Sequence, residues 1–589
     1  MVVFYEKIGL TSYLLALTRQ QSCFYATKSG AARLLDWLCR RVVGNLLRPG
    51  HVKEFGWGDT EYVGHAIRDA AAMANTNMPC LGSSWDAEVS GINLAFLLRK
   101  FVLVEVLYRK YFFYELVIRY AEENPSISLT LFAHLGFAEP YRERLLVAGV
   151  RVVWQKNLPF LASTSALAAL AFIMPMFWRR KIESDSDNPI TGVVCHVESS
   201  QMLVDYLDLL QPEIKPTFVT TPTYSTGIET DDLPDVRIVR LGLSAQAYKE
   251  LGQLLLALGR VLFRNFSAIK FMGWDILRFA NKLVHGRILA PNGSNYQMLV
   301  CEHHDLSKTI RNEFIRKQQS KSILFPYSSL YALRFYADEY YENYDYVLSP
   351  GKHYEDVLTE NESTCSQVVQ VGTFVIHRNG FETQSQEKLR SVREFVGVDR
   401  VVTILCPGVC KPTYQSEIKL MKLANTLAAE DGVKVIIRQK PFLPEPQYIG
   451  FYEGFVEGNS SIMLTGMEFD LFDFLPVTSL FVTTYSTSAC ELAVCGANVL
   501  FVDYLRQDDR FIFWRKEVAG SLVTCEEQAV AKIHKILATQ GNIQGVYRRD
   551  MKKFSEYIGY RFDDYEKYRA NLMGVLRFTL GISLNNSEH

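Results

Sequence analysis

The stretch LFVTTYSTSACE, residues 480–491, decides the fold of the second half of the chain. Its first four residues, Leu480 to Thr483, are apolar or β-branched, which is typical of a short buried strand. A run of hydroxyl side chains follows at once, and a helical pattern begins directly after it. A strand that leads straight into a helix is the repeating unit of a parallel sheet covered by helices. The stretch therefore predicts an α/β fold.

Polar side chains follow three neighbouring strands of this predicted sheet, at the points where the strands end. In open α/β sheets, ligands bind at the carboxyl ends of the strands, where loops lead to helix N-termini. Hydroxyl groups, backbone N–H groups and cations at such an edge bind phosphate, and the helix dipole favours its negative charge. We therefore predict a phosphate site formed by Gly408, Arg438, Lys440, Ser486, Thr487 and Ser488.

Ser488 and Glu491 also match a capping box, in which the serine bonds the N3 amide and the glutamate reaches back to the cap. A capping box explains these two residues without any ligand. It does not explain Ser486 and Thr487, nor the cationic loop after the neighbouring strand. Capping and anion binding are compatible, so both interpretations stay open.

Short β-branched runs alternate with helical stretches from about residue 102 onward. A first cycle ends near residue 371, and a second one begins after the hydrophilic stretch 377–391. Before residue 95 the sequence shows mostly the 3.6-residue apolar spacing of helices, as in 31–47. We therefore predict two Rossmann-like parallel sheets with an N-terminal helical extension. The expected parts of the chain are residues 1–95, 96–376 and 377–545, followed by a helical tail, 546–589.

Three passages of the second half resemble the nucleotide-binding half of the GT-B glycosyltransferases. The first is Tyr344 to Gly351, followed by VVQVGTF. The second is Arg438 to Pro441, which stands where these families place a His-Pro or Lys-Pro pair against the nucleotide phosphate. The third is 481–491 with the following CGANVLFVDY. The similarity is strongest to bacterial polysialyltransferases, capsule Kdo transferases and CDP-glycerol polymerases of teichoic acid, and it covers about a quarter of the chain.

The resemblance implies two Rossmann-like domains facing a cleft, with residues 377–545 binding a nucleotide-sugar donor and residues 96–376 binding the acceptor. It makes Glu491 a candidate ligand of the nucleotide ribose. It also implies that the donor is a substrate and that no metal or resident cofactor takes part. No histidine precedes Pro441, so the role of that imidazole is not carried over.

Two loops of the first half contain candidates for the base that removes the acceptor hydroxyl proton. His196 and Glu198 follow the strand 190–195, just before a helix. A second loop follows the strand 297–301 and holds a denser set of polar residues, namely Glu302, His303, His304 and Asp305. Helix capping and the helix dipole explain either loop equally well, so both interpretations remain.

The charge and the cysteine and histidine spacing argue against two further classes of function, nucleic-acid binding and metal binding. The chain has 589 residues and a formal net charge of −1, which argues against binding nucleic acid, because such proteins normally carry a basic excess. Eleven cysteines without zinc-knuckle spacing are typical of reduced core thiols. We predict no metal site, because adjacent histidines such as His303 and His304 rarely share one ion.

The uncharged segment 158–178 is followed by two arginines and a lysine, Arg179 to Lys181. It is long enough to cross a bilayer, but its prolines and hydroxyl residues also suit a buried or an interfacial helix. The N-terminus lacks the pattern of a secretory signal. We therefore expect a cytoplasmic protein. As an interfacial helix, segment 158–178 would make it peripheral, on the inner face of the plasma membrane.

Together these features predict a glycosyltransferase that moves a sugar from a nucleotide-sugar to a glycan or lipid-linked acceptor in bacterial surface polysaccharide synthesis. Two alternatives remain. One is a CDP-polyol phosphotransferase of the teichoic-acid type, and the other is a non-catalytic, membrane-associated binding module.

Overall fold

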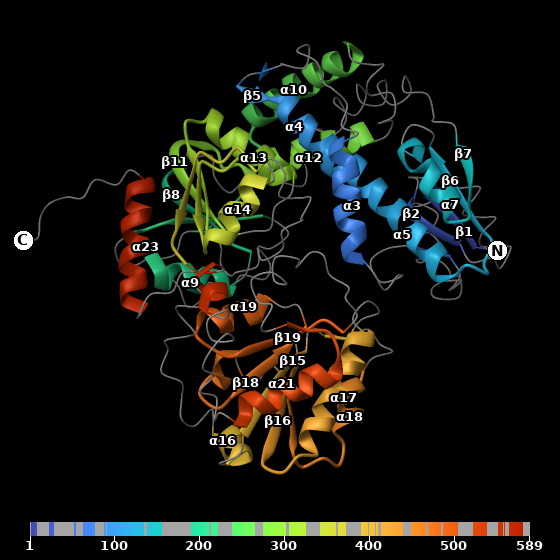
Figure 1. Ribbon diagram of the computed structural model, residues 1–589. Coiled ribbons are helices and arrows are strands. Elements are labelled where there is room, and N and C mark those ends of the chain that lie inside the picture. Colours follow the sequence, from blue (N-terminus) through green and yellow to red (C-terminus); the bar gives the residue numbers. More distant parts are fainter. Residues whose placement is uncertain are drawn as a thin grey trace, which may run out of the picture. The chain divides into compact units, whose positions relative to one another are not determined.

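The computed structural model describes the following residues (Figure 1): 2–8, 23–28, 52–54, 63–76, 88–89, 91–134, 138–155, 190–198, 200–210, 214–221, 238–264, 275–301, 306–325, 342–360, 363–372, 390–397, 400–406, 408–409, 414–439, 449–466, 469, 471–484, 487–504, 522–538, 552–557, 559 and 565–580. The chain divides into two compact units. One comprises Met1–Leu299, His303–Ser322 and Ala337–Tyr344. The other comprises Val300–Glu302, Ile323–Tyr336 and Asp345–His589.

The N-terminal part of the chain forms a five-stranded sheet with the order β3-β2-β1-β6-β7. All its pairs are parallel. Its strands are β1 (Val2–Ile8), β2 (Cys23–Lys28), β3 (Val52–Glu54), β6 (Leu129–His134) and β7 (Val150–Gln155). The first three residues of β1 are all buried, as expected for a central strand covered on both faces.

This sheet corrects two predictions. The helical extension over residues 1–95 is wrong for β1, β2 and β3, whose β-branched and aromatic residues form strands. The predicted strands near 128–133 and 150–154 exist, but they pair within this sheet instead of joining the sheet of residues 96–376. The helical pattern at 31–47 lies outside the described residues.

The helices of this part lie between and after the strands. They are α3 (Val63–Thr76), α4 (Leu94–Lys100), the π-helix η3 (Phe101–Tyr108), α5 (Arg109–Glu123), the 3₁₀ turn η4 (Glu139–Tyr141) and α7 (Arg142–Val147). A small antiparallel hairpin joins β4 (Glu88–Val89) to β5 (Ile92–Asn93). Helix α3 packs against η3 and α5. The buried carboxylate of Glu115 on α5 accepts a 2.8 Å hydrogen bond from Arg144 on α7, which ties these two helices together.

A second sheet has seven strands in the order β10-β9-β8-β11-β12-β13-β14. Its strands are β8 (Ile190–His196), β9 (Thr217–Thr220), β10 (Ile238–Arg240), β11 (Gly293–Val300), β12 (Lys321–Leu324), β13 (Tyr346–Ser349) and β14 (Gln367–Gln370). Its helices are α9 (Ser200–Leu210), α10 (Ala245–Arg264), α12 (Asp275–Leu289), α13 (Leu306–Lys317) and α14 (Lys352–Glu360). Every strand pair of this sheet whose register is described is parallel.

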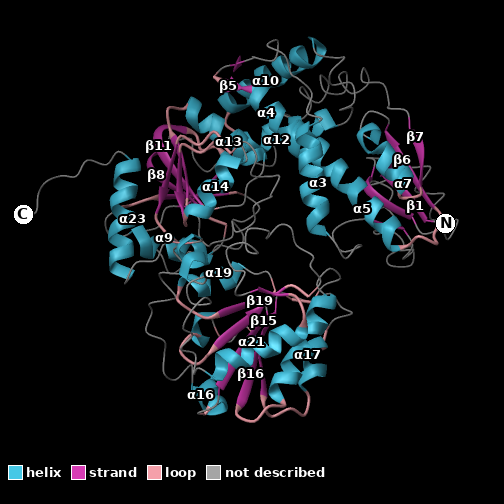
Figure 2. Ribbon diagram, in the orientation of Figure 1, coloured by secondary structure: helices cyan, strands magenta, loops and turns pink. Residues whose placement is uncertain are grey.

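The third sheet has six parallel strands in the order β17-β16-β15-β18-β19-β20. Its strands are β15 (Arg400–Cys406), β16 (Val433–Gln439), β17 (Ile462–Thr465), β18 (Leu480–Thr483), β19 (Val499–Val502) and β20 (Leu522–Val523). Its helices and turns are α16 (Arg390–Val396), α17 (Tyr414–Ala428), α18 (Phe451–Val456), the 3₁₀ turn η8 (Leu471–Phe474), α19 (Thr487–Val494) and α21 (Glu526–Ala538). Figure 2 shows the magenta strands of this sheet beside their cyan helices.

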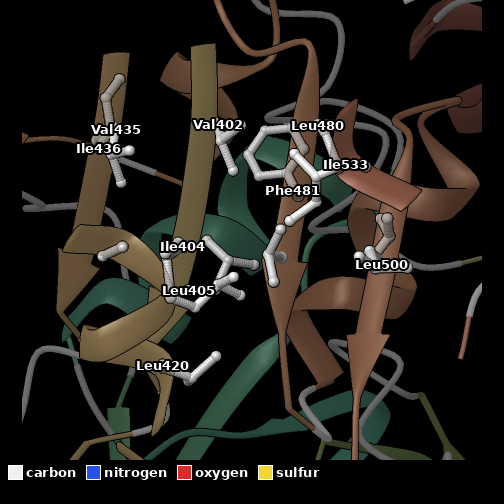
Figure 3. Packing of buried hydrophobic residues seen from close by; sticks show 14 of the residues in the cluster. Val402, Ile404, Leu405, Leu420, Val435, Ile436, Leu480, Phe481, Leu500 and Ile533 are labelled. Atoms are coloured by element: carbon white, nitrogen blue, oxygen red, sulfur yellow. The ribbon is translucent and has the colours of Figure 1, made fainter. Parts of the chain in front are cut away.

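The core of the third sheet is made of aliphatic and aromatic side chains from the strands and the helices on them. Figure 3 shows Leu405, Phe481 and Leu500 on the strands, together with Leu420 from α17 and Ile533 from α21. All five are nearly inaccessible to solvent. Burying one such side chain contributes about 1.5–3 kcal/mol, so this core holds α17 and α21 firmly on the sheet.

The C-terminal tail contains a short helical segment, 552–557, and helix α23 (Tyr565–Leu580). The hydroxyl of Tyr557 donates a 2.8 Å hydrogen bond to Asp356 on α14. The ring of Phe554 packs edge-on against Phe501 of β19. The tail therefore contacts elements of two sheets in the same compact unit.

In each of the three sheets, the first strand of the chain is central, the next two lie on one side, and the later ones lie on the other. This is the strand order of doubly wound Rossmann folds. The prediction of two Rossmann-like parallel sheets is confirmed, and the N-terminal sheet adds a third. The domain boundaries drawn from the sequence stay predictions. Within the part of the chain that the structure describes, no helix is long and apolar enough to cross a membrane. Segment 158–178 lies outside the described residues.

Candidate functional site

The third sheet reverses its strand order between β15 and β18. These two strands are neighbours, and their last paired residues are Leu405 and Thr483. Loops that leave the sheet on either side of such a reversal point diverge, and the crevice between them is where doubly wound folds bind ligands. The loops after β15 and β18 are those predicted from the sequence to bind phosphate.

The loop after β15 contains Gly408, which has a φ of 103°. Side chains other than glycine's are strained at this φ, so the turn depends on a glycine. The N–H of Gly408 donates a 3.2 Å hydrogen bond to Oε1 of Glu417, in the first turn of α17. In this structure the amide of the predicted phosphate loop is therefore held by a carboxylate of the protein.

Glu417 is fully buried and was missed in the sequence analysis. Its Oε2 accepts a 3.1 Å hydrogen bond from the Tyr452 hydroxyl on α18, and the Cys406 thiol also bonds the carboxylate. Burial raises the pKa of Glu417 to about 7, although these donors act to lower it. The sequence could have indicated this burial, because Glu417 lies on the same helix face as the buried residues Leu420, Met421 and Ala424.

Arg438 lies near the end of β16, in register with Leu405. Its guanidinium donates hydrogen bonds to two backbone carbonyls, that of Gln439 and that of Phe469, the latter at 3.2 Å. In this structure Arg438 braces the backbone after β16, and its contact with phosphate stays a prediction. Lys440 lies outside the described residues.

Helix α19 begins at Thr487, four residues after the end of β18 at Thr483. Thr487 and Ser488 lie in its first turn, where backbone N–H groups have no partner within the helix. Ser488 is thus the second residue of the helix and not its N-cap. The predicted capping box of Ser488 and Glu491 therefore starts two residues too late in the sequence. Ser486 lies outside the described residues.

Glu491 lies one turn further along α19 and is only 7% exposed. Its charge contributes to a raised pKa of the neighbouring Cys490 thiol, for which burial is the larger cause. Its predicted contact with a ribose is not tested by these observations.

The second sheet reverses its order between β8 and β11, which pair as far as Cys195 and Leu299. His196, the last residue of β8, is buried, and its Nδ1 lies 3.9 Å from Oε1 of the partly exposed Glu198. The structure thus places these two candidates for the base at a reversal point. Glu302, His303, His304 and Asp305 follow the neighbouring strand and lie outside the described residues.

Among the described residues, no three His, Cys, Asp or Glu side chains lie together in a way that could hold a metal ion. The carboxylate of Glu417 is surrounded by a thiol, a hydroxyl and an amide, all of which act as donors to it. The chemistry available in the described part of the third sheet is thus hydrogen bonding and charge, supplied by backbone amides, Glu417 and Arg438.

No family model matches the sequence, and no curated protein matches it. Among solved structures, a UDP-N-acetylglucosamine 2-epimerase from Listeria monocytogenes is 13% identical with a TM-score of 0.41, covering 68% of this chain and 100% of its own. The wall teichoic acid polymerase TagF is 10% identical with a TM-score of 0.40, covering 72% and 99%. HepE of Anabaena, in complex with UDP-glucose, is 12% identical with a TM-score of 0.38, covering 66% and 100%.

The fold assignment rests on the strand orders of the three sheets.

Proposed function

We propose that the protein is a glycosyltransferase that moves a sugar from a nucleotide-sugar to a glycan or lipid-linked acceptor. One observation carries the proposal. The start of α19, which belongs to one of the motifs resembling GT-B enzymes, and the Gly408 loop follow the two strands on either side of the reversal point of the third sheet. Doubly wound sheets bind nucleotides at such points.

In the proposed reaction, the diphosphate of the donor binds the N-terminus of α19, where backbone amides and the helix dipole favour negative charge. Ser486, Thr487 and Ser488 donate hydrogen bonds to it, Lys440 neutralises charge, and Glu491 contacts the ribose. Charge develops on the leaving phosphate as the bond to the sugar breaks, so the same groups stabilise the transition state. The donor is a substrate, and no resident cofactor is proposed.

The acceptor hydroxyl loses its proton to a base of the second sheet while its oxygen attacks the anomeric carbon of the sugar. The nucleotide leaves with the electron pair of the broken bond, as a nucleoside diphosphate or, from a CMP-sugar, as CMP. We propose the pair His196 and Glu198 as this base, with Glu302, His303 and Asp305 on the neighbouring loop as the alternative. Support for the first is the 3.9 Å approach of the two side chains at the end of β8.

We place the reaction in bacterial surface polysaccharide synthesis, at the inner face of the plasma membrane, on the strength of the sequence resemblance. Thermal unfolding of the full chain with CMP, CDP, UDP, GDP and their sugar conjugates tests the donor site. Binding to the folded state stabilises the protein by about 2.7 kcal/mol when the ligand concentration is a hundredfold above Kd, and this raises the unfolding temperature. The shift is expected to disappear in Lys440→Ala and to persist in Lys434→Ala. Lys434 is a half-buried cation near the start of β16, whose ammonium donates a hydrogen bond to the carbonyl of Ser460.

Incubation with a responding conjugate and analysis of the nucleotide released then separates the three functions. A glycosyltransferase transfers a sugar without phosphate and releases the nucleoside diphosphate from an NDP-sugar or CMP from a CMP-sugar. A CDP-polyol phosphotransferase releases CMP from CDP-glycerol and transfers the polyol together with a phosphate. A binding module gives a thermal shift and no release. Absence of any shift in folded protein contradicts the donor site.

A further inference from the structure

The carboxylate of Glu417 lies directly behind the loop that follows β15. One of its oxygens accepts the N–H of Gly408 at 3.2 Å, and the other accepts the hydroxyl of Tyr452 at 3.1 Å. The side chain is fully buried, so water does not screen its charge. An ionised Glu417 therefore places negative charge one hydrogen bond behind the backbone of the predicted phosphate loop.

The charge of Glu417 changes near neutral pH. Burial raises its pKa to about 7, against the lowering effects of the Tyr452 hydroxyl, the Cys406 thiol and the Gly408 amide. These three groups come from α18, β15 and the loop between β15 and α17, the elements in contact with the carboxylate. Cys406 and Tyr452 keep their protons, because burial raises the pKa of each far above neutrality.

Two effects make an ionised Glu417 unfavourable for an anion in this loop. The first is like-charge repulsion in a buried setting, where it is strong. The second is competition for the Gly408 amide, because a charge-assisted hydrogen bond to a carboxylate is about twice as strong as one to a neutral acceptor. Protonation removes the charge and weakens the hold of Glu417 on that amide.

We propose that Glu417 is a proton-linked positioning residue of the donor site, so that the diphosphate of a nucleotide-sugar binds the Gly408 loop together with one proton on Glu417. The inference rests on the proposed donor site. Binding converts the Glu417 carboxylate and one solvent proton into the neutral carboxyl, and no bond of the donor is broken.

Isothermal titration of the full chain at pH 6 and pH 8 tests this, with UDP-glucose, GDP-mannose and CDP-glycerol as probes. Their phosphates are diesters that gain no proton between these pH values, so a change in affinity comes from the protein. If binding requires the protonated form of Glu417, whose pKa is raised to about 7, the affinity for the probe is expected to fall about tenfold from pH 6 to pH 8. Titrations in two buffers of different ionisation enthalpy are expected to show net proton uptake.

Two variants and one control distinguish this link from a structural role. Glu417→Gln is expected to bind equally at both pH values, with the affinity of the wild type at pH 6. Tyr452→Phe removes a donor that lowers the pKa of Glu417, so the midpoint of the pH dependence is expected to move upward. Glu453→Gln changes an exposed carboxylate next to Tyr452 on α18 and is expected to behave like the wild type.

The outcomes separate the inference from the function on which it rests. If no probe binds at either pH, the donor site itself is contradicted. If a probe binds with equal affinity at pH 6 and pH 8, only the proton link is overturned. A tenfold fall that persists in Glu417→Gln, or a midpoint that stays unchanged in Tyr452→Phe, also overturns it. The Tyr452 variant decides the question should the Glu417 variant not fold.

Discussion

The hydroxyl of Thr483 donates a 3.1 Å hydrogen bond to the backbone carbonyl of Leu405, which joins the last residue of β18 to the second-last residue of β15. Thr483 is fully buried, so this bond is closed off from water. It lies at the reversal point of the third sheet, immediately before the two loops proposed to bind the donor. The separation of these loops therefore depends in part on a single side chain.

Thr483→Val keeps the shape of the side chain and removes this bond. Loss of one buried hydrogen bond costs about 1 kcal/mol. Amide hydrogen exchange of β15 and β18 is expected to become about fivefold faster, since 1.4 kcal/mol corresponds to a factor of about ten. Thr359→Val on the exposed face of α14 serves as the control. Unchanged exchange in both strands would contradict a bracing role for Thr483.

The ionisation of Glu417 is expected to make stability depend on pH. Its pKa is raised from 4.5 to about 7 by burial, so the folded state binds the proton more tightly than the unfolded state. The stabilisation is fully present below pH 4.5 and is lost as the pH rises through about 7. At 1.36 kcal/mol per pH unit, the loss amounts to about 3 kcal/mol.

Urea unfolding of the wild type and of Glu417→Gln at pH 5, 6, 7 and 8 measures this effect. The variant is expected to gain stability relative to the wild type as the pH rises, because glutamine stays neutral. A difference between the two proteins that does not change with pH would contradict the assignment.

Gly286 on α12 is expected to be intolerant of any side chain. A Cβ at this position would lie 2.5 Å from Cγ2 of Ile310 and 2.7 Å from the carbonyl oxygen of Ser307, both on α13. Gly286→Ala therefore forces α12 and α13 apart, and overpacking of this kind costs about 1–3 kcal/mol. We expect a lower unfolding temperature in a calorimetric scan.

Gly252 on α10 is the matched control, because a Cβ there has no neighbouring atom within 4 Å. Gly252→Ala is expected to stabilise α10 by about 0.5–1 kcal/mol through its higher helix propensity. Equal unfolding temperatures of the two alanine variants would contradict the inference that α12 packs closely on α13 at Gly286.

Glu198→Gln tests which loop of the second sheet supplies the proposed base. If Glu198 acts with His196, turnover is expected to fall by about 10²–10⁴ while donor affinity stays unchanged. Asp208→Asn, on the exposed face of α9, controls for a general loss of negative charge. Nearly normal turnover in Glu198→Gln would shift the role to Glu302, His303 or Asp305.

Local patterns predicted much of the third sheet. The runs at 401–405, 433–438 and 480–483 became β15, β16 and β18 almost residue for residue, because buried strands need contiguous β-branched and apolar side chains. The burial of Cys195 and Cys406 was expected for the same reason. The position of such a strand can therefore be predicted from residues that are adjacent in the sequence.

What could not be predicted depends on contacts between distant residues. β1 became a central strand through its pairing with β6, which no local pattern reveals. The hydrogen bond from the guanidinium of Arg438 to the carbonyl of Phe469, 31 residues away, was likewise not predicted. Glu417 was overlooked because its partner Tyr452 lies on another helix, and only the fold brings the two together.

The position of β1 in its sheet also sets an order of events during synthesis. One side of β1 pairs with β2, which follows soon after, but the other pairs with β6 at Leu129–His134. At about 5–20 residues per second, the ribosome delivers β6 on the order of ten seconds after β1. During that interval the apolar strand Val2–Ile8 has one open edge, to which another chain can add. The N-terminal sheet is therefore the part of the nascent protein that we expect to need chaperone protection most.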